Sequence, residues 1–206
     1  MATGDYCTLE ELTRRLWPSG QTPDELDDID LARLITDVSR EIDDYTGRRF
    51  YTTSSDETRY FTFDPDYGGK LYTGDIQSIT TLATDDEADR TYGTTWAATD
   101  YDLLPANAAL DSRPYTHIKR APLGDYSFPT VEKGVKITGK FGYSSSTSPA
   151  DTPARVKEAL IQQILMDFGS GGGPQTWRES LGGASGSVIL HPDIKRRLYP
   201  LRMNVT

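Results

Sequence analysis

The side chains able to do covalent chemistry are few and widely separated in this chain of 206 residues. Cys7 precedes a helix-like segment, His117 lies in a strand-like segment, and His191 lies near the C-terminus; they are the only thiol and imidazole groups. A nucleophile and its base must come within hydrogen-bonding distance, so catalysis would require these distant regions to converge. We therefore expect each to be an ordinary structural or surface residue, and we expect no enzymatic activity.

Neither a metal site nor a cofactor site is indicated. Asp85, Glu87 and Asp89 alternate in TDDEADRTYG, as ligands do in a calcium loop, but the glycine at the sixth place and the distal glutamate are missing. The segment GSGGGPQTW lacks the lysine and hydroxyl residue of a phosphate-binding loop. We expect a solvated hairpin turn at the acidic segment and no bound cofactor.

Aromatic residues in the central region leave a binding function open. Exposed rings can stack on sugars, whereas rings in small antiparallel sheets mostly form the core or cross-strand pairs. A monomeric module that holds a glycan or peptide therefore remains an alternative. The rings concerned are Tyr60, Phe61, Tyr72, Tyr92, Trp96 and Tyr101.

The net charge of −9 argues against a general nucleic-acid-binding protein, which would carry a basic face. Residues 1–47 carry twelve acidic and four basic residues, whereas residues 185–206 carry one acidic and four basic residues. These oppositely charged ends could attract each other within one chain or between neighbouring copies. The single cysteine excludes an intrachain disulfide, and no signal peptide or membrane span is expected.

Two amphipathic helices are predicted to flank a β region. Residues 8–17 have Thr8 and Glu11 at capping-box spacing, and residues 24–47 have an apolar stripe that ends at Gly47. A further apolar stripe predicts a helix over residues 152–168. These helices are expected to pack as a small bundle formed by residues 1–47 and 150–168.

The region 48–149 alternates β-branched or aromatic residues with polar ones, and turn-rich segments separate the runs. About six or seven short strands predict an antiparallel β-sandwich or small barrel inserted into the bundle. The predicted fold class is therefore α+β: a small helical bundle with an inserted β domain and an extended C-terminal arm.

The C-terminal region combines a glycine-rich stretch with an apolar, basic segment. Residues 169–186 contain seven glycines, a composition typical of a flexible tether. Residues 187–206 then place Ile194, Leu198 and Leu201 at helical spacing with basic residues between them. Such an amphipathic segment can dock in a groove of another protein; folding back onto its own body is the alternative.

The order of these segments resembles the head–tail connector, or adaptor, proteins of long-tailed double-stranded DNA phages and gene-transfer particles. The segments that carry this resemblance span nearly the whole chain. They are YCTLEELTRRL, REIDDYTGRRFY, DIQSITTLATDDEADRTY, DYDLLPANA, GVKITGKFGY, TPARVKEALIQQIL and SVILHPDIKRRLYPLR.

The resemblance implies a structural virion protein, made in the host cytoplasm, that forms a ring under the portal protein, commonly of twelve copies. Such a ring joins the portal to the next neck or tail-completion protein and leaves a channel that DNA traverses without specific binding. Another neck or tail-completion protein of the same particle remains possible. By position, the portal-binding residues would be Ile189, Ile194, Arg196, Arg197, Leu198, Tyr199, Leu201 and Arg202.

Overall fold

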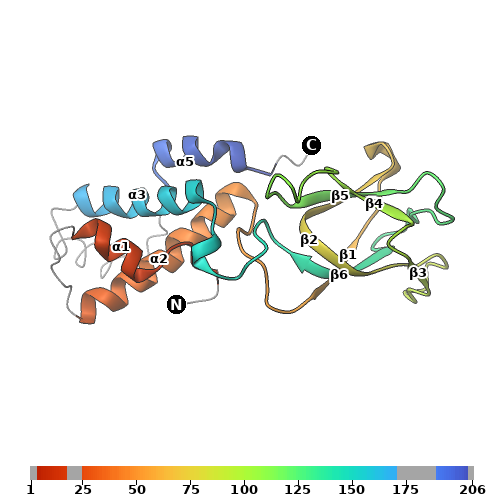
Figure 1. Cartoon of the computed structure of the whole chain (residues 1–206), viewed down its shortest axis with the longest axis horizontal. Helices are drawn as coiled ribbons and strands as arrows, with labels where there is room; N and C mark the ends of the chain where they lie inside the picture. Colours follow the sequence, from red (N-terminus) through yellow and green to blue (C-terminus); the bar gives the residue numbers. More distant parts are fainter. Residues whose placement is uncertain (1–3, 18–24, 171–188, 204–206) are drawn as a thin grey trace. The chain divides into compact units, whose positions relative to one another are not determined.

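The computed structural model divides the chain into two units (Figure 1). It describes residues 4–17, 25–170 and 189–203, so most of the predicted tether lies outside the described residues. The helical unit comprises Met1–Phe50 and Thr147–Thr206, and the β unit comprises Tyr51–Ser146. The two units are considered separately below.

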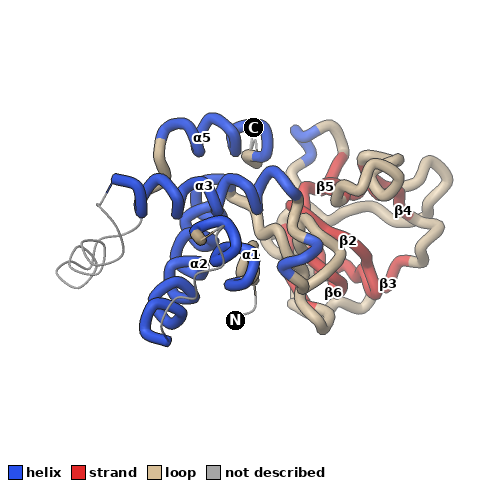
Figure 2. The backbone as a smooth tube through the Cα atoms, turned by 60° about the vertical axis from the view of Figure 1, so that its left-hand side comes forward, coloured by secondary structure: helices blue, strands red, loops and turns tan. Residues whose placement is uncertain are grey.

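The helical unit is built in layers, with α3 between α5 and the N-terminal half of α2 in both views (Figures 1 and 2). The short helix α1 contacts α2 and α3, and α5 contacts α3 and the C-terminal part of α2. The elements are α1 (Leu9–Leu16), α2 (Glu25–Thr46), η2 (Pro149–Asp151), α3 (Ala154–Ser170), α5 (Pro192–Leu198) and η3 (Tyr199–Leu201).

Local capping sets the ends of the first two helices. The Thr8 hydroxyl accepts a hydrogen bond from the Glu11 N–H at 3.0 Å, and the Glu11 carboxylate accepts one from the Thr8 N–H at 2.9 Å. This capping box satisfies two N–H groups at the start of α1. At the end of α2, Gly47 has φ 66°, a left-handed conformation that terminates a helix at little cost for glycine. Both predicted helix signals are confirmed.

The core of the helical unit is largely aliphatic and receives side chains from the C-terminal segment, defined here as residues 189–203. Leu190, Ile194 and Leu198 of this segment are at most 1% exposed. The predicted extended arm is thus not confirmed, because in this structure the segment packs on its own helical unit. The other buried apolar residues of α1, α2 and α3 are Leu12, Leu31, Leu34, Ile35, Val38, Ile42, Val156, Ala159, Leu160, Ile161 and Ile164.

The β unit is a single antiparallel sheet of six strands in the order β1-β6-β2-β5-β4, with β3 also paired to β2. The sequence prediction of about six or seven short strands agrees with this number. The strands are β1 (Glu57–Phe61), β2 (Lys70–Thr84), β3 (Thr94–Trp96), β4 (Tyr101–Leu104), β5 (Tyr115–Arg120) and β6 (Val135–Phe141). A 3-10 turn, η1 (Pro65–Tyr67), lies between β1 and β2.

The sheet is irregular and is not closed. The pairing of β2 with β5 shifts register between Tyr72 and Ile76, around Gly74 at φ 67°; a bulge of this kind bends a strand. Strands β1 and β4 are its two ends, and no pairing joins them among the described residues. The expected sandwich or barrel is therefore not confirmed, although the sheet does enclose an aromatic-rich core. Its buried members are Leu71, Ile76, Leu82, Trp96, Ile118, Phe128, Val135, Ile137 and Phe141.

Among the described residues, no helix is long and apolar enough to span a membrane.

Candidate functional site

The structure divides the eight predicted portal-binding residues between two faces of the C-terminal segment. Ile194 and Leu198 have no exposed surface, because they pack into the core of the helical unit. Ile189 and Tyr199 are 74% and 66% exposed. Arg196, Arg197 and Arg202 are exposed, and Leu201 is partly buried. The segment therefore keeps an outer face that is apolar and cationic.

Gln163 on α3 holds the start of the C-terminal segment. Its side chain is 2% exposed. Its Oε1 accepts a hydrogen bond from the His191 N–H at 2.8 Å, and its Nε2 lies 3.5 Å from the Ile189 carbonyl and 3.0 Å from both carboxylate oxygens of Asp167. A buried amide with partners on both sides fixes the path of the chain, because an unsatisfied N–H would be costly there.

This role of Gln163 was missed in the sequence analysis, although a signal was present. Gln163 follows Val156 and Leu160 by seven and three residues, so it lies on the apolar face of the predicted helix. A polar side chain at such a position needs hydrogen-bond partners when it is buried. The pattern could therefore have indicated a buried polar contact, but not its partner.

Tyr45, near the end of α2, anchors the middle of the C-terminal segment. Its hydroxyl donates a hydrogen bond to the Lys195 carbonyl at 3.0 Å. The Lys195 Nζ and the Arg202 guanidinium lie 5.9 Å and 5.2 Å from the centre of its ring, within the range of cation–π attraction. The Met203 N–H also donates to the Thr46 carbonyl at 2.8 Å. The segment is thus attached to α2 at several points.

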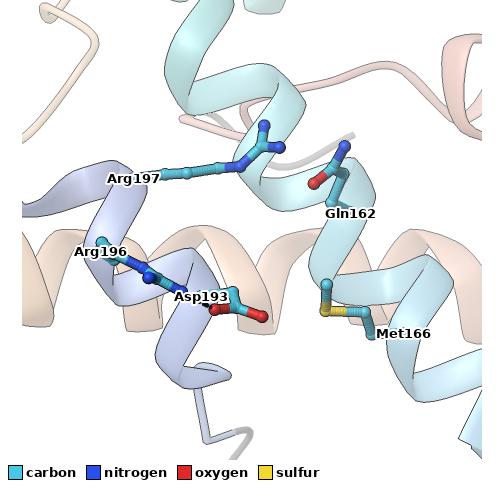
Figure 3. Close-up of a pocket in the computed structure, with 5 residues that line it drawn as sticks. All are labelled: Gln162, Met166, Asp193, Arg196 and Arg197. Atoms are coloured by element: carbon cyan, nitrogen blue, oxygen red, sulfur yellow. Dashed lines mark hydrogen bonds and ion pairs between the residues drawn. The ribbon is translucent and has the colours of Figure 1, made fainter.

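An open pocket of about 450 Å³ lies between α3 and α5 (Figure 3). Arg196 forms an ion pair with Asp193 on the same helix, and Arg197 extends from α5 toward α3. Met166 contributes an apolar side chain that is 37% exposed. Together with Gln162, these residues line a cationic hollow with an apolar part, a combination suited to an apolar side chain flanked by carboxylates.

The thiol and the two imidazole groups are divided between the two units. Cys7 is fully buried, and burial raises the pKa of its thiol to about 12, so it is protonated at neutral pH. His191 caps α5, because its Nδ1 accepts a hydrogen bond from the Asp193 N–H at 3.3 Å. His117 lies in the β unit, where desolvation, followed by the charge of Lys70, lowers its pKa. All three thus have structural surroundings.

The acidic segment after β2 holds a turn together. Asp85 is 1% exposed and accepts hydrogen bonds from the N–H groups of Asp89 and Arg90 at 3.1 and 3.0 Å. Asp89 in turn accepts one from the Thr91 N–H at 2.8 Å. The expected solvated hairpin turn is confirmed for residues 86–91, which are exposed. It is wrong for Asp85, whose carboxylate is buried and accepts hydrogen bonds from the backbone. Within the described residues, no group of three or more His, Cys, Asp or Glu could hold a metal.

The aromatic residues considered for ligand binding mostly pack inside the β unit. Trp96 is 4% exposed and stacks on Phe128 at 4.6 Å between ring centres. Tyr60 is 49% exposed and packs against Tyr92 with the two rings tilted and their centres 5.4 Å apart. The Lys136 Nζ lies 5.0 Å from the centre of the Tyr92 ring. Tyr60 is thus the exposed ring of the predicted aromatic set, whose other members are partly or fully buried.

A buried polar cluster anchors the N-terminal residues of the helical unit. The Tyr6 hydroxyl donates to Asp43 and accepts from the Phe50 N–H at 3.0 Å, and Arg40 lies 3.0 Å from the Asp43 carboxylate. Burial, the largest influence, raises the pKa of Asp43 to about 6, against the opposing effects of Tyr6 and Arg40. Asp43 is thus poised to titrate in mildly acidic solution.

The whole chain has the fold of chains in structures of gene transfer agent (GTA) particles. Each match covers 100% of this chain and 94% of the other. The neck of the empty GTA particle, computed with C6 symmetry, and the neck of the native particle, computed with C12 symmetry, each match at 15% identity and a TM-score of 0.56. The virion of the native GTA particle matches at 17% identity and 0.55.

No protein-family model and no curated protein matches the sequence. At these sequence identities the likeness concerns the fold. At that level it confirms the resemblance to connector-type proteins that the order of the sequence segments indicated, because the neighbours belong to GTA necks and to the GTA virion.

Proposed function

We propose that this protein is a structural component of a virion neck: a head–tail connector that joins the portal to the next neck or tail-completion protein. The observation that carries the proposal is the agreement in fold over the full chain with chains of GTA necks, which includes both the helical unit and the β unit. The burial of Cys7 and the helix-capping role of His191 fit a protein that works by binding.

The proposed assembly is a ring, and twelve copies is the number we favour. The matching necks were computed with C6 and C12 symmetry, and a ring of twelve identical subunits is compatible with both. The net charge of −9 suits a channel wall, because like charge repels the phosphates of passing DNA. The protein would be made in the host cytoplasm and reside in the neck of the particle.

The proposed portal contact uses the outer face of the C-terminal segment. Ile189 and Tyr199 supply exposed apolar surface, and Arg202 supplies a cation beside them. Ile194 and Leu198 would act indirectly, since they are buried and hold the segment on α2 and α3. Twelve copies of a modest contact would bind strongly, because each further contact in a ring is intramolecular.

A pull-down on the cognate portal ring tests this proposal. Deletion after residue 186 would also remove Leu190, Ile194 and Leu198 from the core, so loss of binding could reflect misfolding. A triple substitution, Ile189→Ser, Tyr199→Ala and Arg202→Ala, spares those three core residues.

We expect the triple variant to lose portal binding and the wild type to bind. The matched control is Leu110→Ser with Leu123→Ser, at residues of the β unit that are 85% and 96% exposed, and it should bind like the wild type. Failure of the wild type to bind the portal would contradict the connector proposal. Equal binding by the wild type and the triple variant would contradict the docking face.

The alternative function is a monomeric module that holds a glycan or peptide, and the exposed ring of Tyr60, paired with the half-buried Tyr92, favours it. Base- and sugar-stacking surfaces of proteins use accessible rings of this kind. A glycan and peptide array probed with the wild type and with Tyr60→Ala separates the two. Binding that depends on Tyr60, together with no binding to the portal, would support the module.

A further inference from the structure

The pocket between α3 and α5 has a chemistry that another part of the same chain complements. Its apolar surface is Met166, and its rim carries Arg196 and Arg197. Arg196 is engaged by Asp193, whereas Arg197 has no ion pair among the described residues. A ligand for this pocket should therefore present an apolar side chain beside carboxylates.

Ile29 on α2 has these properties. Its side chain is 66% exposed, which is unusual for an isoleucine in an amphipathic helix. Asp28 and Asp30, its neighbours in sequence, are both partly exposed, and on a helix they lie to either side of it. The result is an apolar knob between two carboxylates, complementary to an apolar hollow with guanidinium groups at its rim.

Ile29 lies far along α2 from the part of that helix that touches α5, because it precedes Tyr45, which bonds to Lys195 of α5, by sixteen residues, about 24 Å along the helix axis. In both views α3 lies between the N-terminal part of α2 and α5 (Figures 1 and 2). A chain in this conformation cannot fill its own pocket with Ile29. Two different surfaces that fit each other make a head-to-tail contact, and such a contact generates a ring when the rotation closes.

We propose that Ile29, with Asp28 and Asp30, docks in the α3–α5 pocket of a second copy of this chain, with Arg197 and Arg196 as the ionic partners of the two aspartates. This contact deepens the proposed function, on which its closure into a ring rests, by naming the surface between neighbouring subunits. It assigns the exposed arginines of α5 to the neighbouring copy, and it leaves Ile189, Tyr199 and Arg202 for the portal.

Disulfide trapping between two single-site variants tests the contact in the full chain without any portal. Ile29→Cys and Met166→Cys are made separately, with tags of different size, mixed at low ionic strength and oxidised. Cys7 does not interfere, because it is fully buried. We expect a disulfide-linked heterodimer from the mixture. The matched control mixes Ile29→Cys with Leu123→Cys, whose parent side chain is 96% exposed in the β unit.

Charge reversal then tests the ionic partners. In the trapping variants, Asp28→Lys with Asp30→Lys on the knob side, or Arg196→Glu with Arg197→Glu on the pocket side, should each lower the trapped yield about tenfold, because like charges then meet. Combining the two reversed partners should restore the yield. Circular dichroism of each variant checks that the helical unit is folded. Ile29→Glu removes the apolar knob and leaves both aspartates and both arginines in place. This variant should lower self-association measured by sedimentation.

Two outcomes overturn this contact: a trapped yield for the Ile29–Met166 pair no higher than for the control pair, or no recovery when both charges are reversed. The portal pull-down tests the proposed function independently of the trapping experiment. Successful trapping with no portal binding would leave a self-associating protein that is not a connector. Portal binding without trapping would leave a connector whose ring uses another surface.

Discussion

The central strand of the β unit and the last helix of the helical unit are held in place by different kinds of contact. Strand β2 has 15 residues and pairs through its backbone with β6 on one edge and with β5 and β3 on the other. Helix α5 has seven residues. Its hydrogen bonds as a helix are internal, so its attachment depends on side chains such as Leu198, Gln163 and Tyr45.

This difference matters for the proposed function. A strand inside a ladder is held at every residue, so one surface change hardly moves it, whereas a short helix on side-chain anchors can be loosened by a single substitution. The element proposed to contact the portal and the neighbouring subunit is therefore also the one whose position depends on a few residues. The following substitutions test this contrast, beginning with the largest expected effect.

Phe141→Ala should destabilise the β unit, with the largest effect of the three substitutions. Phe141 is fully buried, stacks on Phe61 at 6.1 Å and lies under the Arg59 guanidinium at 4.2 Å. Removing its ring should lower the free energy of unfolding by about 3–5 kcal/mol. Urea unfolding followed by near-ultraviolet circular dichroism measures the change. Tyr60→Ala, at a 49% exposed ring of the same sheet, is the control and should cost about 1 kcal/mol or less; equal losses would refute this assignment of the core.

Gln163→Leu should loosen the C-terminal segment while the rest of the helical unit stays folded. The change keeps most of the side-chain volume but leaves the partly buried His191 N–H without its acceptor, at a cost of about 1–3 kcal/mol. Amide hydrogen exchange of His191 and Ile194 should then speed up by about tenfold or more. Gln162→Leu is the matched control, because its amide bonds to Glu158 within α3. Unchanged exchange in Gln163→Leu would show that the apolar contacts alone fix the segment.

Asp43→Asn should remove a pH dependence of the helical unit, with the smallest effect of the three. Burial raises the pKa of Asp43 to about 6, so the folded chain binds this proton more tightly than the unfolded chain. Its contribution to stability is present below about pH 4 and is lost as the pH rises through about 6, by an amount on the order of 1–2 kcal/mol.

Thermal unfolding of the wild type and of Asp43→Asn between these pH values gives the difference directly. The wild type should lose more stability than Asp43→Asn as the pH rises. Asp37→Asn, at an exposed carboxylate of the same helix, should retain the wild-type slope. The same slope in Asp43→Asn and in the wild type would mean that another group titrates.

The helices and strands were predictable because their signals are local. The Thr8–Glu11 capping box and the left-handed Gly47 act within one turn of a helix. The alternation that predicted about six or seven short strands is likewise a local pattern, and six strands form. The way the strands close depends on bulges such as the one around Gly74 and on contacts between distant residues, so the predicted sandwich or barrel could not be decided from the pattern.

In the candidate site too, local features were predictable from the sequence and contacts between distant residues were not. The spacing of Ile194 and Leu198 predicted an amphipathic helix, which α5 confirms. The sequence alone could not say which surface covers its apolar face, because a groove on the portal and the groove between α2 and α3 would demand the same pattern. The buried Gln163, which bonds to residues 26 and 28 positions away, had no partner that the sequence could name.

The sequence by itself determined the elements, the separation of acidic and basic ends and the order of segments that resembles connector proteins, because composition and short-range periodicity are properties of the chain alone. Only the tertiary structure decided that Leu190, Ile194 and Leu198 face inward, that Arg197 lines a pocket beside Met166, and that Ile29 stays exposed on α2. These outcomes depend on which helices pack together, and packing brings together residues whose separation in sequence carries no local signal.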